Sequence, residues 1–140
     1  MQQRKLSYAG NDFIRSDVKR LRKRWSNIET GITDFFNRLR GEIAEQISHT
    51  PAVWGDFLCH RELGDKKIIF CKKRITLNPK DGSSGGARLV YAVVQNDFSF
   101  IPFLVFSASE EKTFYLINNK KFRLKSRGLL QIVDEKLKML

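Results

Sequence analysis

Residues 66–108, KKIIFCKKRITLNPKDGSSGGARLVYAVVQNDFSFIPFLVFSA, predict the centre of the fold. The stretch contains three runs rich in β-branched and aromatic residues, over 66–77, 87–94 and 98–108, separated by turn-forming residues. The connections are short enough for the runs to be antiparallel neighbours. Pro102 has no backbone N–H, so we expect 98–108 to be an edge strand, or to pair regularly only after Pro102.

Two helical patterns precede these strands. The first begins near Asn11–Asp12, the second covers 26–47, and a tight turn near Trp25–Asn27 joins them. Pro51, Gly55 and Gly64 interrupt 48–66, which we expect to be a connection. The apolar positions at helical spacing are Phe13, Ile14, Val18, Leu21 and Trp25 in the first pattern, and Ile28, Ile32, Phe35, Phe36, Leu39, Ile43 and Ile47 in the second.

The C-terminal segment SRGLLQIVDEKLKML, 126–140, again shows helical spacing, with one apolar side formed by Leu129, Ile132, Val133, Leu137 and Leu140. The predicted fold class is therefore α+β: an N-terminal helical hairpin packed on a small, mainly antiparallel sheet, with a C-terminal helix. A length of 140 residues fits a single domain, 1–140, in which we expect 1–11 and the C-terminal tail to be peripheral.

The chain is strongly basic, with 26 Lys and Arg against 15 Asp and Glu and a formal net charge of +11. Such a domain usually meets a polyanion, which is RNA, DNA, an anionic membrane surface or an acidic protein. The alternative is a charge that only keeps the protein soluble. The sequence shows no signal peptide and no apolar run near the roughly 20 residues of a membrane span, so we expect a cytoplasmic protein without membrane association.

Metal and cofactor chemistry finds no support in the sequence. It contains no phosphate-binding loop, no zinc-protease motif and no nucleophile elbow. Cys59 and Cys71 lack a metal-binding spacing and are expected to be buried thiols, while His49 and His60 stand alone. We therefore expect no metal and no cofactor.

Cations interrupt the predicted strands. Alternation places Lys72 and Arg74 on one face of 66–77 and Lys73 on the other. If 87–94 is the neighbouring strand in suitable register, Arg88 joins Lys72 and Arg74, and a phosphate would relieve the repulsion among the three. The alternative is an ordinary solvated face.

The first helical pattern also carries a group of cations on its outer faces. We expect these side chains to lie along RNA phosphates, or otherwise to form a solvated face. They are Lys19, Arg20, Arg22, Lys23 and Arg24.

Three short segments, in this order and spacing, resemble the RelE/ParE superfamily of bacterial toxin–antitoxin toxins, and more specifically RelE- and HigB-like members. They are KKR at 72–74, SGGARLVY at 84–91 and FSASEE at 106–111, and the resemblance covers roughly 12–117. It implies a compact sheet packed on two helices, with a basic concave face. It also implies a toxin that inhibits translation by ribosome-dependent endonucleolytic cleavage of mRNA.

The resemblance further implies roles for individual residues. Arg88 would clamp the phosphate, and Lys72 and Arg74 would position it. Alternatively, Lys72 with a lowered pKa would transfer a proton, and Tyr115 aligns with a catalytic tyrosine of some members. Lys73 and Lys112 are the remaining candidate RNA contacts. The implied partners are mRNA on the ribosome, with rRNA contacts, and an acidic antitoxin protein.

The chain also departs from the superfamily pattern. Phe106 and Ala108 stand where relatives often have Tyr and Lys, and Ser109 or Glu110 stands where some have a late catalytic Arg. Tyr115 has the alternative of packing beside its aromatic neighbour. Two other functions therefore stay open: a non-nucleolytic toxin directed at DNA gyrase, as in the ParE branch, and a basic nucleic-acid-binding module.

Overall fold

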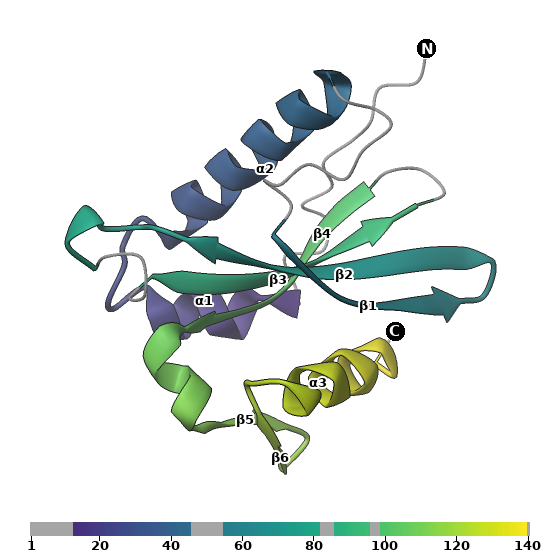
Figure 1. Cartoon of the computed structure of the whole chain (residues 1–140). Coiled ribbons are helices and arrows are strands. Elements are labelled where there is room, and N and C mark those ends of the chain that lie inside the picture. The colour runs from purple at the N-terminus through teal and green to yellow at the C-terminus, as the bar shows by residue number, and fades with distance from the viewer. Residues whose placement is uncertain (1–12, 46–54, 82–85, 96–98, 140) are drawn as a thin grey trace.

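The computed structural model describes residues 13–45, 55–81, 86–95 and 99–139, with only the backbone for 42–45 (Figure 1). These ranges form an α+β structure, as predicted. Its helices and strands are α1 (Arg15–Leu21), α2 (Ile28–Glu45), β1 (Asp56–Leu63), β2 (Lys66–Ile75), β3 (Ala87–Val94), β4 (Ser99–Ser107), β5 (Phe114–Ile117), β6 (Lys120–Arg123) and α3 (Arg127–Leu137), with two 3-10 turns, η3 (Pro79–Asp81) and η4 (Ala108–Lys112).

The main sheet has the order β1-β2-β3-β4, and each neighbouring pair is antiparallel. Its last three strands confirm the predicted runs to within about two residues at each end. β4 is an edge strand, as Pro102 indicates, and the register between β3 and β4 shifts at this point. The missing N–H of proline therefore falls where the ladder is already irregular.

β1 corrects the expectation that 48–66 is a connection. Residues 56–63 pair with β2, whereas 48–54 lie outside the described ranges. Gly55 and Gly64 enclose the strand, and their φ angles of 85° and 64° suit glycine. A register shift after Phe57 breaks the alternation, and Cys59 is the one buried residue of β1, so the segment lacks the usual burial pattern of a strand.

The N-terminal helical hairpin is confirmed in part. α1 is shorter than its sequence pattern because the chain leaves the helix after Leu21, and a start near Asn11–Asp12 lies outside the described residues. Trp25 Nε1 donates to an Asp81 carboxylate oxygen at 2.8 Å, and the Asn27 amide donates to the Leu77 carbonyl at 3.1 Å. These bonds fix the α1–α2 turn to the β2–β3 connection.

One core lies between the two N-terminal helices and the sheet. Tyr91 of β3 packs edge-on against Phe35 and Phe36 of α2, with ring centroids 5.3 and 5.7 Å apart. All of the predicted apolar helix positions whose side chains are described contribute to this core, Phe13 only from its border. Ile43 and Ile47 lie outside that part of the structure.

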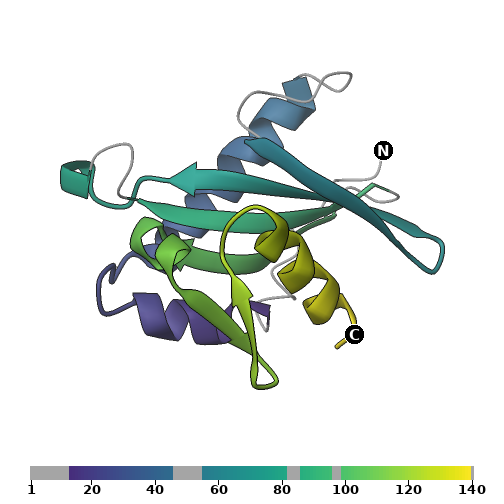
Figure 2. The same cartoon turned by 60° about the horizontal axis from the view of Figure 1, so that its bottom comes forward.

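A second core lies on the opposite face of the sheet, beneath α3 and the β5–β6 hairpin (Figure 2). Leu129, Ile132 and Val133 of α3 are buried there, as the spacing predicts, and Leu137 packs at its border. Every residue of β3 is buried because both faces of the sheet are covered. The sheet face that carries Arg88, which the resemblance implies to be concave and basic, is therefore covered by α3 and the β5–β6 hairpin over much of its area.

The β5–β6 hairpin was not expected from the sequence. Asn118 and Asn119 have φ angles of 49° and 66°, which is the conformation of a two-residue type I′ turn. The register pairs Phe114 with Arg123, so each strand has four residues. In the described part of the chain, no helix combines the length and the hydrophobicity that crossing a membrane requires.

Candidate nucleic-acid interface

β2 and β3 bring the predicted cations together at one end of the sheet. Arg74 lies directly opposite Arg88, and Lys72 lies opposite Val90, so all three side chains belong to the same face. Lys73 lies opposite Leu89 and belongs to the other face. We call Lys72, Arg74 and Arg88 the sheet-end cluster.

Arg88 is the most enclosed member of the sheet-end cluster, with a side chain that is only 9% exposed. Its Nη1 donates to the Gly86 carbonyl at 3.1 Å, and its Nε lies 3.3 Å from Oε1 of Glu111. Burial, and next the charge of Arg74, lower the pKa of Arg88, while Glu111 acts in the opposite direction. Arg88 thus stays charged and holds η4 against the end of β3.

The other two members of the sheet-end cluster are more accessible. Arg74 is exposed and Lys72 is half-buried, and neither makes a hydrogen bond or ion pair with another described side chain. No carboxylate of the described residues lies within ion-pair distance of either charge, although Asp56 of β1 is the cross-strand partner of Lys72. The arrangement is suited to an external anion.

Glu111 is a member of this site that the sequence did not identify. It stands in the FSASEE segment, but the sequence alone cannot tell which of its two glutamates faces the cluster. η4 settles this, because the Glu110 carboxylate accepts the backbone N–H of Ser107 at 2.8 Å and contacts Arg20 at 2.8 Å. Glu111 is the carboxylate at Arg88, and Lys112 lies exposed at the end of η4.

The predicted cations of the first helix divide into two groups. Arg20 pairs with Asp17 and Glu110, Arg22 with Glu29, and Arg24 with Asp81 at 3.6 Å. Lys19 and Lys23 are exposed and make no such contact with the described residues. Of the five predicted cations, these two are therefore accessible to an external phosphate and form no ion pair with a carboxylate of the described residues.

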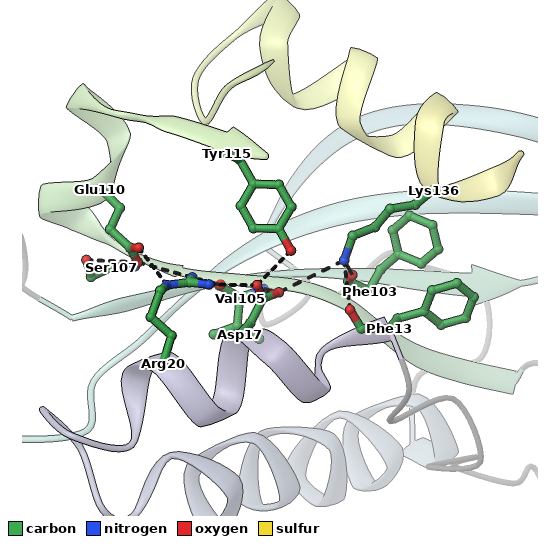
Figure 3. A network of polar contacts seen from close by, with 9 residues as sticks. All are labelled: Phe13, Asp17, Arg20, Phe103, Val105, Ser107, Glu110, Tyr115 and Lys136. Atoms are coloured by element: carbon green, nitrogen blue, oxygen red, sulfur yellow. Dashed lines mark hydrogen bonds and ion pairs between the residues drawn. The ribbon is translucent and has the colours of Figure 1, made fainter. Parts of the chain in front are cut away.

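Tyr115 belongs to a separate polar network beside β4 (Figure 3). Its hydroxyl donates to Oδ1 of Asp17 at 2.7 Å, and burial, together with the Asp17 charge, raises its pKa. Lys136 Nζ and the Arg20 guanidinium lie 5.5 and 5.9 Å from the Tyr115 ring. The structure therefore places Tyr115 in this network and does not join it to the sheet-end cluster.

The same network covers the outer edge of β4. Oδ2 of Asp17 accepts the Val105 N–H at 3.1 Å, and Arg20 donates to the Val105 carbonyl at 3.1 Å. Lys136 Nζ donates to the Phe103 and Phe13 carbonyls at 2.6 and 2.8 Å (Figure 3). Side chains from α1 and α3 thus occupy three of the backbone groups, at Phe103 and Val105, that an edge strand offers to another strand.

Neither cysteines nor acidic clusters provide a metal site in the described part of the chain. Cys59 and Cys71 are free thiols that belong to the cores on opposite faces of the sheet. No group of three His, Cys, Asp or Glu side chains in the described ranges is close enough to hold a metal ion.

Comparison with protein-family models, with curated proteins and with solved structures gave no match to this chain.

Proposed function

We propose that this protein is a toxin of a toxin–antitoxin pair that inhibits translation by cutting mRNA on the ribosome. The observation that carries the proposal is the position of Arg74 directly opposite Arg88, with Lys72 on the same face. Glu111 neutralises only one of the two facing guanidinium charges, and an RNA phosphate relieves the repulsion that remains. The order of short segments that resembles the RelE/ParE superfamily supports the assignment to toxins.

The proposed cleavage is a transfer reaction within the RNA and needs no metal. The ribose 2′-oxygen attacks the neighbouring phosphorus, the bond from phosphorus to the 5′-oxygen breaks, and a 2′,3′-cyclic phosphate and a 5′-hydroxyl form. Arg88 and Arg74 stabilise the charge of the phosphorane. Glu111 accepts the 2′-OH proton and Lys72 protonates the leaving 5′-oxygen.

Partners follow from the charge distribution. Lys19, Lys23 and Lys112 are exposed, and the proposal assigns them to phosphates of the ribosome or the message. An acidic antitoxin segment competes for the same cations and holds the toxin inactive in the cytoplasm. The check on this part of the proposal is the gene neighbourhood, where we expect a small acidic reading frame directly beside the gene.

The test is controlled expression in bacterial cells with mapping of mRNA 5′ ends. The wild-type chain is expected to stop growth within minutes and to produce new 5′ ends in phase with codons. Arg74→Gln and Lys72→Gln remove exposed or half-buried charges, so both should fold and lose most of the cutting. Lys138→Gln, which removes an exposed cation at the C-terminal cap of α3, is the matched control that retains the cutting.

A second candidate is a basic nucleic-acid-binding module without cleavage. It is favoured by the enclosure of Arg88, whose contacts with Gly86 and Glu111 are those of a residue that positions η4. In that case expression leaves mRNA intact and growth unaffected, while RNA or DNA binding persists. Growth arrest with DNA damage and intact mRNA would instead identify a gyrase-directed toxin.

A further inference from the structure

The outer face of the β5–β6 hairpin combines exposed apolar side chains with cations. Phe114 and Leu116 are 56% and 63% exposed, although both are large hydrophobic residues. The register places Arg123 opposite Phe114 and Lys121 opposite Leu116. These four side chains lie on one face of the hairpin, with the two apolar residues on β5 and the two cations opposite them on β6. We call this face the hairpin face.

The opposite side of the same hairpin is anchored in the second core. Tyr115 and Phe122 are cross-strand partners that pack at the border of this core, and Ile117 is buried in it. The hairpin is thereby fixed against α3, as Figure 2 shows. The hairpin face therefore contributes little to folding, and its apolar residues have no internal reason to be Phe and Leu.

The charges of the hairpin face also lack an internal purpose. The Arg123 guanidinium carbon lies 5.9 Å from the centroid of the Phe114 ring, which brings a planar cation and an aromatic ring together. Within the described residues, no carboxylate contacts Arg123, Lys121 or the neighbouring Lys112. The face is thus positive and half apolar, with one accessible aromatic ring.

We propose that the hairpin face binds single-stranded RNA, with a base stacked on Phe114 and with Lys121 and Arg123 at the flanking phosphates. An aromatic platform between cations is the usual means of holding single-stranded nucleic acid without reading its sequence. Insertion into a lipid surface generally uses a wider apolar face than two side chains. An acidic protein needs the cations but has no need of an exposed ring.

The hairpin face is connected directly to the sheet-end cluster. η4 begins after β4 and carries Glu111, the partner of Arg88, and Thr113 alone separates η4 from Phe114. A single RNA strand bound at both the hairpin face and the sheet-end cluster would run along η4. The inference rests on the proposed function only in taking RNA as the ligand, and it does not require cleavage.

The experiment measures binding of the purified full chain to a labelled, unstructured RNA of about 12 nucleotides by fluorescence anisotropy. Phe114→Leu keeps an apolar side chain but removes the ring, and it is expected to weaken binding about fivefold or more. Phe114→Trp is expected to retain binding, and RNA should quench the new indole emission. Together these variants test stacking with a readout that a merely structural role would not give.

The cations are tested by salt dependence. Lys121→Gln and Arg123→Gln should each make the slope of log affinity against log salt shallower by about 0.7. Lys138→Gln, which also removes one exposed charge, should leave the slope unchanged. Circular dichroism of each variant establishes that it is folded.

Three outcomes overturn the inference. Phe114→Leu binding RNA as tightly as the wild-type chain excludes stacking. If the wild-type chain and the Phe114→Leu variant both bind vesicles of anionic phospholipid but not RNA, the ligand is a lipid surface. If they bind only an acidic polypeptide, the ligand is a protein. RNA binding that depends on Phe114 in a chain that cuts no mRNA supports the hairpin face and refutes the cleavage proposal, so the two failures are distinguishable.

Discussion

Nζ of Lys136 lies 4.0 Å from Oδ2 of Asp17, and both side chains are buried beside the outer edge of β4. The pair joins the first and last helices of the chain across the sheet edge. Burial lowers the pKa of Lys136, and the Asp17 charge opposes this effect. Each charge is therefore tolerated in the interior because of the other and of the backbone groups that both contact.

Replacing Asp17 by Ala should lower the free energy of unfolding by about 3–5 kcal/mol, because Lys136 is left charged and buried without its partner. The Val105 N–H and the Tyr115 hydroxyl lose their acceptor in the same variant. Urea denaturation measures the change. Asp34→Ala, at an exposed position of α2, should stay within about 0.5 kcal/mol of the wild-type value. Equal effects at both positions would contradict the described network.

Gly86→Ala should destabilise the protein by about 1–3 kcal/mol. A Cβ at Gly86 would lie 2.4 Å from the carbonyl oxygen of Ile75, which belongs to the backbone and cannot move aside easily. Gly41→Ala is the matched control, because a Cβ there meets nothing within 4 Å and alanine favours the helix by about 0.5–1 kcal/mol. Thermal unfolding should therefore shift in opposite directions for the two variants.

Cys71 predicts a loss of stability at alkaline pH. Burial raises the pKa of its thiol to about 11, while a hydrogen bond with Tyr91 acts in the opposite direction. Between about pH 9 and 11 the unfolded chain has released this proton and the folded chain retains it, so stability falls as pH rises. The full effect is at most about 2–3 kcal/mol.

The measurement compares the pH dependence of urea unfolding for Cys71→Ala with that of its parent, both in a Cys59→Ala background. This background is needed because burial also raises the pKa of Cys59. The Cys71→Ala chain should show the shallower decline above pH 9. Parallel curves would show that the Cys71 thiol does not titrate differently in the folded state.

Much of the fold follows from patterns in the sequence, and the exceptions have physical causes. The strands at 66–75, 87–94 and 99–107 are runs of eight to ten residues that contain several β-branched and aromatic residues, and turn residues separate them, so these patterns identify them. β1 was not predicted because most of its residues are exposed. The β5–β6 hairpin was not predicted because each of its strands has only four residues. Their positions depend on docking to β2 and α3, which local propensity does not encode.

The candidate site was predictable to a similar extent. The convergence of Lys72, Arg74 and Arg88 follows from alternation once β2 and β3 are neighbours in the observed register. The contact partners of these residues cannot be predicted from alternation, because a contact such as that of Arg88 with Glu111 depends on the conformation of η4. Tyr115 was singled out from the resemblance, whereas its bond to Asp17 spans 98 residues of sequence.

Glu111→Gln separates binding from catalysis in the proposed toxin. Removing the carboxylate beside Arg88 should raise affinity for single-stranded RNA several-fold, because one competing charge is lost and RNA phosphates then contact Arg88 more readily. The same change should slow mRNA cutting by about 100-fold or more, since general base catalysis is lost. Anisotropy and 5′-end mapping measure the two effects.

A decrease in RNA affinity for Glu111→Gln would mean that Glu111 mainly orients Arg88. Glu135→Gln on α3 is the control, because this carboxylate contacts Lys138 and Lys120, away from the sheet-end cluster. It also removes one negative charge from the chain. A rise in affinity for both variants would indicate only the change in net charge.

The covered edge of β4 restricts how this sheet can grow. β1 has a neighbour on one side only within the described sheet, whereas Asp17, Arg20 and Lys136 already occupy backbone groups at the far edge. Two copies that meet through β1 would form a continuous sheet ending in a covered strand on each side. Strand pairing through this four-stranded sheet then stops at a dimer and does not propagate into a fibre.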